Sequence, residues 1–164
     1  MVFAGWCVFL ALITWMIQGA LDRQYNPNTS PSTYLSSEVR EVVLERNRAA
    51  HYVVSGGINN QAVEFLVDTG ATDIALSERT AGRLGIRRGQ PVTLSTANGL
   101  ARGYRSVADR VSVGGIVMTN VPVVVSPGID DNTVLLGMSF LKHLELVQRD
   151  GKLILRQFVD QTAG

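Results

Sequence analysis

The sequence contains little cysteine, little histidine and no marked excess of charge of either sign. Its single cysteine, Cys7, excludes disulfide frameworks and thiolate metal sites. The formal net charge is +1 and charged residues make up 18% of the chain, so no basic face is available to neutralise several phosphates. His51 and His143 lie far apart with no third ligand at metal-like spacing. We therefore expect neither a nucleic-acid partner nor a metal site.

Long apolar runs are also absent, with one exception at the N-terminus. From Val2 to Ile17 the chain carries no charge, and weaker apolar character continues to Leu21. A helix that spans a bilayer needs about 20 mostly apolar residues, so residues 1–21 predict a single-pass membrane anchor. A cleaved signal peptide and a buried core helix are the alternatives, although no Lys or Arg precedes the run. The flanking charges nearly cancel, so they do not set the orientation.

Residues 22–40 are poor in large apolar side chains. Their central part, QYNPNTSPSTYLSS over residues 24–37, is rich in Asn, Pro, Ser and Thr and buries too little surface to offset the entropy of ordering. We expect a flexible tether here, followed by one folded domain over residues 41–160. Such a domain is small, and association with a second copy would stabilise it.

Beyond the tether, short runs rich in Val, Ile and Leu are separated by Gly, Asn, Asp and Pro, which is typical of strands joined by tight turns. Asn59-Asn60, Asn98-Gly99, Gly114-Gly115 and Asp150-Gly151 suit two-residue hairpin turns because these residue types adopt positive φ at low cost. The sequence therefore predicts an all-β domain with one or two short helices. The expected helices cover 77–84, with Ser77 as N-cap, and 138–144; the expected strands cover 39–44, 51–58, 61–67, 91–95, 101–113, 117–125, 133–136 and 152–158.

One acidic residue stands out, because Asp68 follows directly on the apolar run Phe65-Leu66-Val67 and opens a turn of small residues. Aspartates are common in turns, and an ordinary Asx-turn is the alternative to a functional role. A carboxylate at the end of a buried strand is, however, partly removed from water, which is typical of groups used in catalysis. Ser139 lacks the flanking glycines of a nucleophile elbow, so we do not expect a serine nucleophile.

The segment Phe65-Leu66-Val67-Asp68-Thr69-Gly70-Ala71 resembles the active-site loop of pepsin-like and retroviral-like aspartic proteases. Pepsin-like enzymes carry the triplet twice, whereas this chain has one Asp-Thr-Gly, so the resemblance is to the single-copy branch. A second match is Val134-Leu135-Leu136-Gly137 with the helix after it, which resembles the segment behind the catalytic loop. The resemblance covers residues 41–158, and its closest form is the group of bacterial retropepsin-like proteases with an N-terminal membrane segment.

This resemblance implies a closed β-barrel, a two-fold homodimer, a protein or peptide substrate and no cofactor. It also implies a membrane-anchored protein whose protease domain lies in the periplasm of a bacterium. Two nearby carboxylates share one proton, so one acts as base on a water while the other acts as acid on the scissile carbonyl. The resemblance thus implies that Asp68 is the catalytic aspartate. It also implies that Thr69 contacts Thr69 of the other copy across the dimer axis and that Gly70 leaves room for the carboxylates.

Substrate binding is assigned by the same resemblance to the residues after the triplet, Ala71 and Thr72, and to a mobile cover over residues 96–103. The residues of that cover expected at the substrate are Ala97, Asn98, Gly99 and Leu100. A plain surface hairpin is the alternative for this segment. We also expect residues 152–158 to form a terminal strand whose exposed edge joins two copies.

The leading hypothesis from the sequence is therefore an aspartic endopeptidase that is active as a homodimer. The alternative is a catalytically silent dimeric module that binds peptides or assembles with partners through the same fold. An intermediate possibility is an enzyme whose activity is controlled by weak dimerisation, since half-sites are inert.

Overall fold

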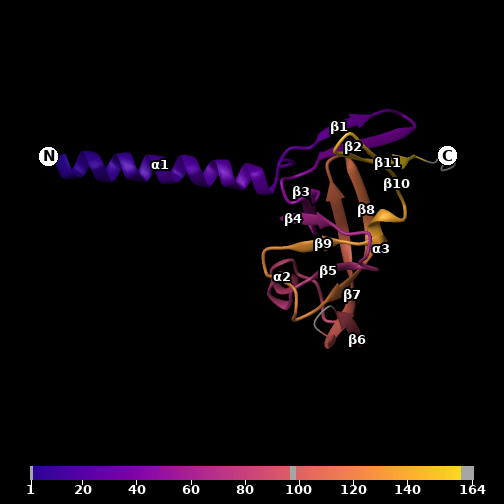
Figure 1. Ribbon diagram of the computed structural model, residues 1–164. Coiled ribbons are helices and arrows are strands. Elements are labelled where there is room, and N and C mark those ends of the chain that lie inside the picture. Colours follow the sequence, from indigo (N-terminus) through magenta and orange to yellow (C-terminus); the bar gives the residue numbers. More distant parts are fainter. Residues whose placement is uncertain (1, 97–98, 160–164) are drawn as a thin grey trace.

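The computed structural model describes residues 2–96 and 99–159, which form one long helix and a body made mostly of strands (Figure 1). Helix α1 (Val2–Tyr25) extends away from this body. The body contains two sheets and two short helices, α2 (Glu78–Arg83) and α3 (Met138–Leu141). The predicted mostly-β fold with few short helices is confirmed.

The larger sheet has seven strands in the order β3-β4-β9-β5-β8-β7-β6. β3 also pairs with β7 over Gly56 to Ile58, so the sheet curls back toward its own first strand. A closed barrel stays a prediction. The strand bounds are β3 (Val53–Ile58), β4 (Gln61–Val67), β5 (Ile74–Leu76), β6 (Gln90–Thr96), β7 (Gly99–Val113), β8 (Ile116–Val125) and β9 (Val134–Leu136).

The smaller sheet has four strands in the order β1-β2-β11-β10. Its strands are β1 (Ser32–Leu35), β2 (Val39–Glu45), β10 (Glu145–Arg149) and β11 (Lys152–Phe158). β11 is paired along its whole length with β2 and also with β10. The expectation of an exposed edge at residues 152–158 is therefore wrong, because both edges of this strand are already hydrogen-bonded within the chain.

Positive φ angles occur at the expected turns. Asn59 and Asn60 have φ of 49° and 63°, and Asp150 and Gly151 have φ of 51° and 76°. Gly114, with φ of 53°, begins the turn between β7 and β8. These residues join consecutive antiparallel strands. The turns between such strands need positive φ angles, which Gly, Asn and Asp adopt at low energetic cost.

The core lies between the sheets and under the two short helices. Its largest fully buried side chains include Phe65 on β4, Leu136 on β9 and Phe140 on α3. α2 begins where Ser77 caps it, since the Ser77 side chain accepts a hydrogen bond from the Thr80 N–H. The apolar strand before Asp68 lies beside β9, with which it pairs in parallel.

Three strands were not predicted, and each lacks a local signal. β5 has only three residues and owes its place to pairing with β8 and β9. β1 lies in a Ser- and Thr-rich segment and forms only by pairing with β2. β10 follows directly on the predicted helix 138–144, which in the structure ends at Leu141.

The membrane anchor predicted for residues 1–21 is contradicted. No helix among the described residues is both long and apolar enough to cross a membrane. α1 does not end with the apolar run but continues through Asp22, Arg23 and Gln24 to Tyr25, so its last turns are polar. The single-pass, membrane-anchored location with a periplasmic domain is therefore not supported.

The flexible tether predicted for residues 22–40 is also incorrect for part of that range. Asn26 and Asn28 are 2% and 3% exposed. The Asn28 side chain donates to the Val53 and Glu45 carbonyl oxygens at 2.7 Å and 2.9 Å and accepts from the Glu45 N–H at 2.6 Å. Composition predicted disorder because it counts apolar area, whereas this segment is held by asparagine side chains that replace strand hydrogen bonds.

Candidate active site

Asp68 lies at the end of β4, where this strand runs parallel to β9. The Asp68 N–H donates to the Leu136 carbonyl oxygen at 3.1 Å, which fixes the backbone of the acid against β9. The Asp68 carboxylate accepts a hydrogen bond from the Gly70 N–H at 2.8 Å. The side chain is half-buried, so a carboxylate with a set orientation remains accessible to solvent.

The loop after Asp68 is attached on its far side to the start of α3. The Met138 and Ser139 N–H groups donate to the carbonyl oxygens of Ala71 and Thr72, both at 2.8 Å. Gly137 makes this approach possible, because a Cβ atom there would lie 2.2 Å from the Asp73 carbonyl oxygen and 2.7 Å from that of Ala71. The Leu-Leu-Gly segment therefore supports the Asp68 loop directly.

Ser139 contributes a second support that the sequence reasoning missed. Its buried hydroxyl accepts from the Ile74 N–H at 3.0 Å and donates to the Pro122 carbonyl oxygen at 2.8 Å. Ser139 thus joins the end of the Asp68 loop to β8. Nothing local in the sequence marks this role, because the bonded partners are 65 and 17 residues away.

The expected catalytic and substrate-binding residues of the loop share one exposed stretch. Thr69, Gly70 and Thr72 are exposed, and Ala71 is half-buried. Gly70 sits close to the acid, since a Cβ atom there would lie 3.1 Å from Asp68 Oδ1. The structure brings Asp68, Thr69, Gly70, Ala71 and Thr72 together, and their roles stay predictions.

An ion pair connects this loop to β7. Arg105 donates through Nε and Nη2 to Asp73 Oδ2 at 3.1 Å and 3.0 Å. The Asp73 side chain is 11% exposed and that of Arg105 is 57% exposed. Neither residue was singled out from the sequence, since an acid and an arginine 32 residues apart give no pairing signal.

The expected cover is a hairpin of β6 and β7, with Thr96 paired to Gly99. β7 pairs with β8 only from Tyr104 onward, so residues 99–103 pair with β6 alone. Leu100 is 81% exposed. Ala97 and Asn98 lie outside the described residues. A two-stranded ribbon without a third strand is marginally stable, which suits a mobile cover, but this role stays a prediction.

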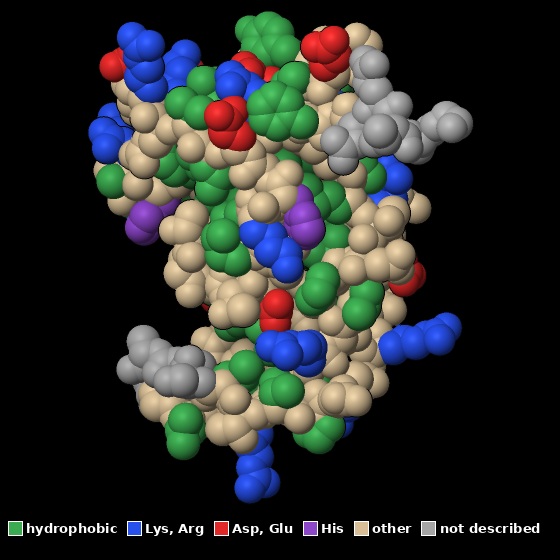
Figure 2. Space-filling view, turned by 90° about the vertical axis from the view of Figure 1, so that its right-hand side faces the viewer, with side chains coloured by type: hydrophobic (Ala, Val, Ile, Leu, Met, Phe, Trp, Pro, Cys, Tyr) green, Lys and Arg blue, Asp and Glu red, His purple; other side chains and the backbone are tan. Residues whose placement is uncertain are grey.

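Neither of two well-formed cavities among the described residues is lined by Asp68 or by residues 69–73. Figure 2 shows the face opposite α1, where the outline narrows between an upper part with the four-stranded sheet and a lower part with the β6–β7 hairpin. Residues 2–96 and 99–159 contain no cluster of three His, Cys, Asp or Glu side chains able to hold a metal ion.

Comparison with known proteins gives a consistent result. A family model described as gag-polyprotein putative aspartyl protease matches residues 54–143. An uncharacterised protein of a Sinorhizobium species is 35% identical over 121 residues, covering 71% of this chain and 52% of that protein. An uncharacterised protein of Rickettsia prowazekii is 32% identical over 163 residues, covering 94% of this chain and 70% of that protein.

A solved structure also matches the chain. The crystal structure of a retropepsin-like aspartic protease from Rickettsia conorii is 31% identical, with a TM-score of 0.62, and covers 79% of this chain and 97% of that one. This chain spans about half the length of the Sinorhizobium relative. The family match covers more than half of the chain and includes Asp68, Thr69, Gly70 and the Leu-Leu-Gly segment. The chain therefore belongs to the gag-polyprotein putative aspartyl protease family and has a retropepsin-like fold.

Proposed function

We propose that this protein is an aspartic endopeptidase whose active site forms between two copies of the chain. The observation that supports this proposal most is that both the carboxylate and the backbone of Asp68 are held in place by hydrogen bonds. Its carboxylate is oriented by the Gly70 N–H, and its backbone is tied to Leu136 at the end of a buried strand. The sequence contains one Asp-Thr-Gly, so a second such carboxylate has to come from a second copy.

Two carboxylates brought together cannot both ionise cheaply, so they hold one proton between them. The ionised Asp68 takes a proton from a water molecule, and that water attacks the carbonyl carbon of the scissile peptide bond. The protonated Asp68 of the other copy donates its proton to the carbonyl oxygen as the tetrahedral intermediate forms. Collapse of this intermediate, with a proton delivered to the leaving nitrogen, completes hydrolysis.

The neighbouring residues suit this arrangement. Thr69 is exposed beside the acid, where its hydroxyl is free to meet the same residue of a second copy. Gly70 has no side chain to separate the two carboxylates, and a Cβ atom there would press on Asp68 Oδ1 at 3.1 Å. Since an active site needs its groups held before substrate arrives, the hydrogen bonds from Met138 and Ser139 to this loop support the same conclusion.

The substrate class is a polypeptide in an extended conformation. Ala71 and Thr72 lie directly after the catalytic triplet, and Thr72 is exposed. The two-stranded end of the β6–β7 hairpin, with Leu100 at its surface, is the cover that would close over such a strand and exclude water. Gly99, with φ of 104°, gives the backbone of this hairpin a conformation that other residues rarely adopt.

The test is cleavage of a degenerate peptide library by purified protein from acid to neutral pH, with Asp68→Asn as the decisive variant. The substitution is nearly isosteric, and we expect cleavage to fall by at least about three orders of magnitude with the fold retained. Asp109→Asn is the matched control, because Asp109 is an exposed acid on β7 with no ion pair among the described residues. Normal cleavage by Asp68→Asn would refute the proposal, and peptide binding without cleavage by the wild type would favour a silent binding module.

A further inference from the structure

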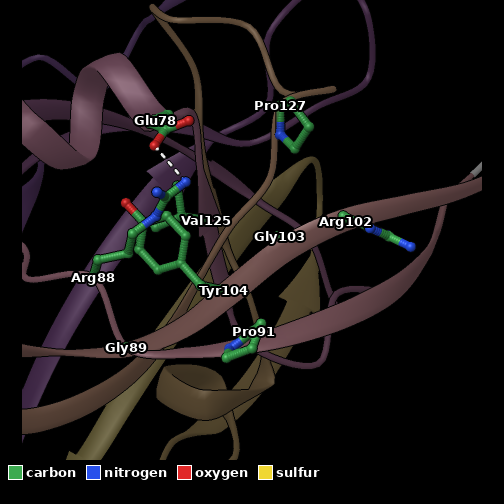
Figure 3. Close-up of a pocket in the computed structure, with 9 residues that line it drawn as sticks. All are labelled: Glu78, Arg88, Gly89, Pro91, Arg102, Gly103, Tyr104, Val125 and Pro127. Atoms are coloured by element: carbon green, nitrogen blue, oxygen red, sulfur yellow. Dashed lines mark ion pairs between the residues drawn. The ribbon is translucent and has the colours of Figure 1, made fainter.

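A cavity of about 390 Å³ lies at the base of the β6–β7 hairpin, away from Asp68 (Figure 3). It is bounded by the first residue of α2, the segment from Arg88 into β6, residues 102–104 of β7, and the end of β8 with the loop after it. Its volume falls in the range of sites that hold small molecules or side chains, roughly 300–1,000 Å³. The cavity therefore lies between the β6–β7 hairpin and the part of the body formed by α2 and β8.

Tyr104 supplies an unused hydrogen-bond donor in this cavity. Its side chain lines the cavity and the residue is 8% exposed, yet its hydroxyl forms no hydrogen bond with any residue that the structure describes. Burial and the nearby Glu78 carboxylate raise the pKa of Tyr104 above its usual value, so the hydroxyl keeps its proton at neutral pH. The hydroxyl is not one of the enclosed, unpartnered side-chain atoms of the described residues, so it faces solvent, and a bound ligand can accept its hydrogen bond in place of water.

The charged groups of the cavity favour an anion. Arg88 lies over the Tyr104 ring, 5.1 Å from its centroid, and pairs with Glu78 at 3.0 Å. Arg102 lies at the other end of the cavity in Figure 3 and forms no ion pair among residues 2–96 and 99–159. Two arginines and one carboxylate thus line the cavity, which leaves one positive charge uncompensated, and the Arg102 side chain points away from the Arg88–Glu78 pair in Figure 3.

The remaining walls are apolar. Pro91, Val125 and Pro127 line the cavity between the two arginines. Walls of this kind pack against the methylene groups of a side chain, while the arginines and the Tyr104 hydroxyl can donate hydrogen bonds to a carboxylate at its end. An acidic side chain of a polypeptide has this combination of parts.

We propose that this cavity is an accessory subsite that binds an acidic side chain of the polypeptide substrate at the base of the covering hairpin. The inference rests on the proposed function in taking the bound polypeptide to be the substrate. Because Tyr104 and Arg102 belong to the same strand as the cover, an occupied cavity connects that strand to α2 and to the loop after β8.

Binding is tested in full-length Asp68→Asn protein, where the peptide is not consumed. Fluorescence anisotropy is measured with a labelled peptide, acetylated and amidated at its ends, that carries one Glu among Leu and Ala residues. Its matched partner has Gln in place of Glu. We expect the Glu peptide to bind about tenfold more tightly, the difference that a charge-assisted contact supplies.

Variants of the cavity sharpen this test because they act in opposite directions. Arg102→Gln is expected to weaken binding of the Glu peptide about three- to tenfold, and Tyr104→Phe about fivefold. Glu78→Gln is expected to strengthen it about threefold, since Arg88 is then released from its partner. Arg110→Gln, which removes an exposed arginine of the same strand outside the cavity, is the control and leaves binding unchanged.

Equal binding of the Glu and Gln peptides, or equal binding by all four variants, would overturn the proposal and leave the protease function standing. Failure of the proposed function alone gives a different result. If wild-type protein cleaves no peptide while the Glu peptide binds with the expected variant pattern, the cavity is a peptide site and the proposed function fails.

Discussion

The loop that carries Asp68 and the hairpin that is expected to cover it are held in different ways. Residues 68–74 are attached to the β9–α3 segment by three backbone hydrogen bonds and by the Ser139 hydroxyl. The hairpin from residue 99 to 103 is attached to the body by no strand other than β6. One region is thus fixed from several sides and the other from its base alone.

This difference matches what peptide hydrolysis demands. Catalytic groups act best when their positions are set in advance, since reorganisation during the reaction is costly. A cover, in contrast, has to open for an extended chain and then exclude water. The one ion pair between the loop and β7 among the described residues is Asp73–Arg105; it lies at the end of the loop, and Arg105 follows the hairpin segment 99–103 by two residues.

The largest loss of stability and activity is expected at Gly137, where the Asp68 loop leaves no space for a side chain. Gly137→Ala places a Cβ atom 2.2 Å from a backbone oxygen of Asp73, which has to move. We expect a loss of about 3 kcal/mol or more in the free energy of unfolding, together with strongly reduced cleavage. Urea denaturation measures the first and peptide cleavage the second.

Gly82→Ala is the matched control for this substitution. Gly82 lies inside α2, and a Cβ atom there meets nothing within 4 Å. The change should be neutral or stabilising by up to about 1 kcal/mol, because alanine is the better helix former. A Gly137→Ala protein as stable as Gly82→Ala would show that the loop is not held against α3 as described.

A smaller effect is expected at Ser139. Ser139→Ala leaves the Ile74 N–H and the Pro122 carbonyl oxygen without this partner in a buried site. Stability should fall by about 1–3 kcal/mol, and cleavage should fall mainly through kcat, because the loop loses its fixed position. Ser106→Ala removes an exposed hydrogen bond to Arg87 and serves as the control, with a change of less than about 0.5 kcal/mol.

The smallest effect is expected at the ion pair between the loop and the base of the hairpin. Arg105→Gln removes an ion pair whose arginine is more than half exposed, so it should cost no more than about 1 kcal/mol of stability. If the pair coordinates loop and hairpin, KM for peptides should rise in the variant while kcat changes little. Added salt should then raise the KM of the wild type toward that of the variant. Arg149→Gln, which breaks the more exposed pair with Asp150, is the control; identical kinetics in both variants would remove Arg105 from the account.

The sequence predicted those parts of the fold that are encoded locally. Alternating apolar runs with Asn or Gly turns indicated the long strands, and Ser77 marked the start of α2. Asp68 was singled out because a carboxylate directly after an apolar strand is unusual, and its catalytic role stays a prediction. Parts that depend on distant partners were missed, as β5, Ser139 and the Asp73–Arg105 pair show.

The N-terminal region shows the opposite error. A run without charge predicted a membrane anchor, and polar composition predicted a tether. The helix instead continues through polar residues to Tyr25, and Asn26 and Asn28 are buried after it. Hydropathy and composition count side chains one at a time, whereas Asn28 is held by three hydrogen bonds to two separate strands.

The central claim is that two copies of Asp68 form one active site, and subunit mixing tests it most directly. Wild-type protein and Asp68→Asn are combined at constant total concentration, allowed to exchange, and assayed for peptide cleavage. Because random pairing at equal amounts leaves about one quarter of the dimers with two aspartates, cleavage should fall to about one quarter of the pure wild-type rate. A fall to about one half, the value for chains that act alone, would contradict the account.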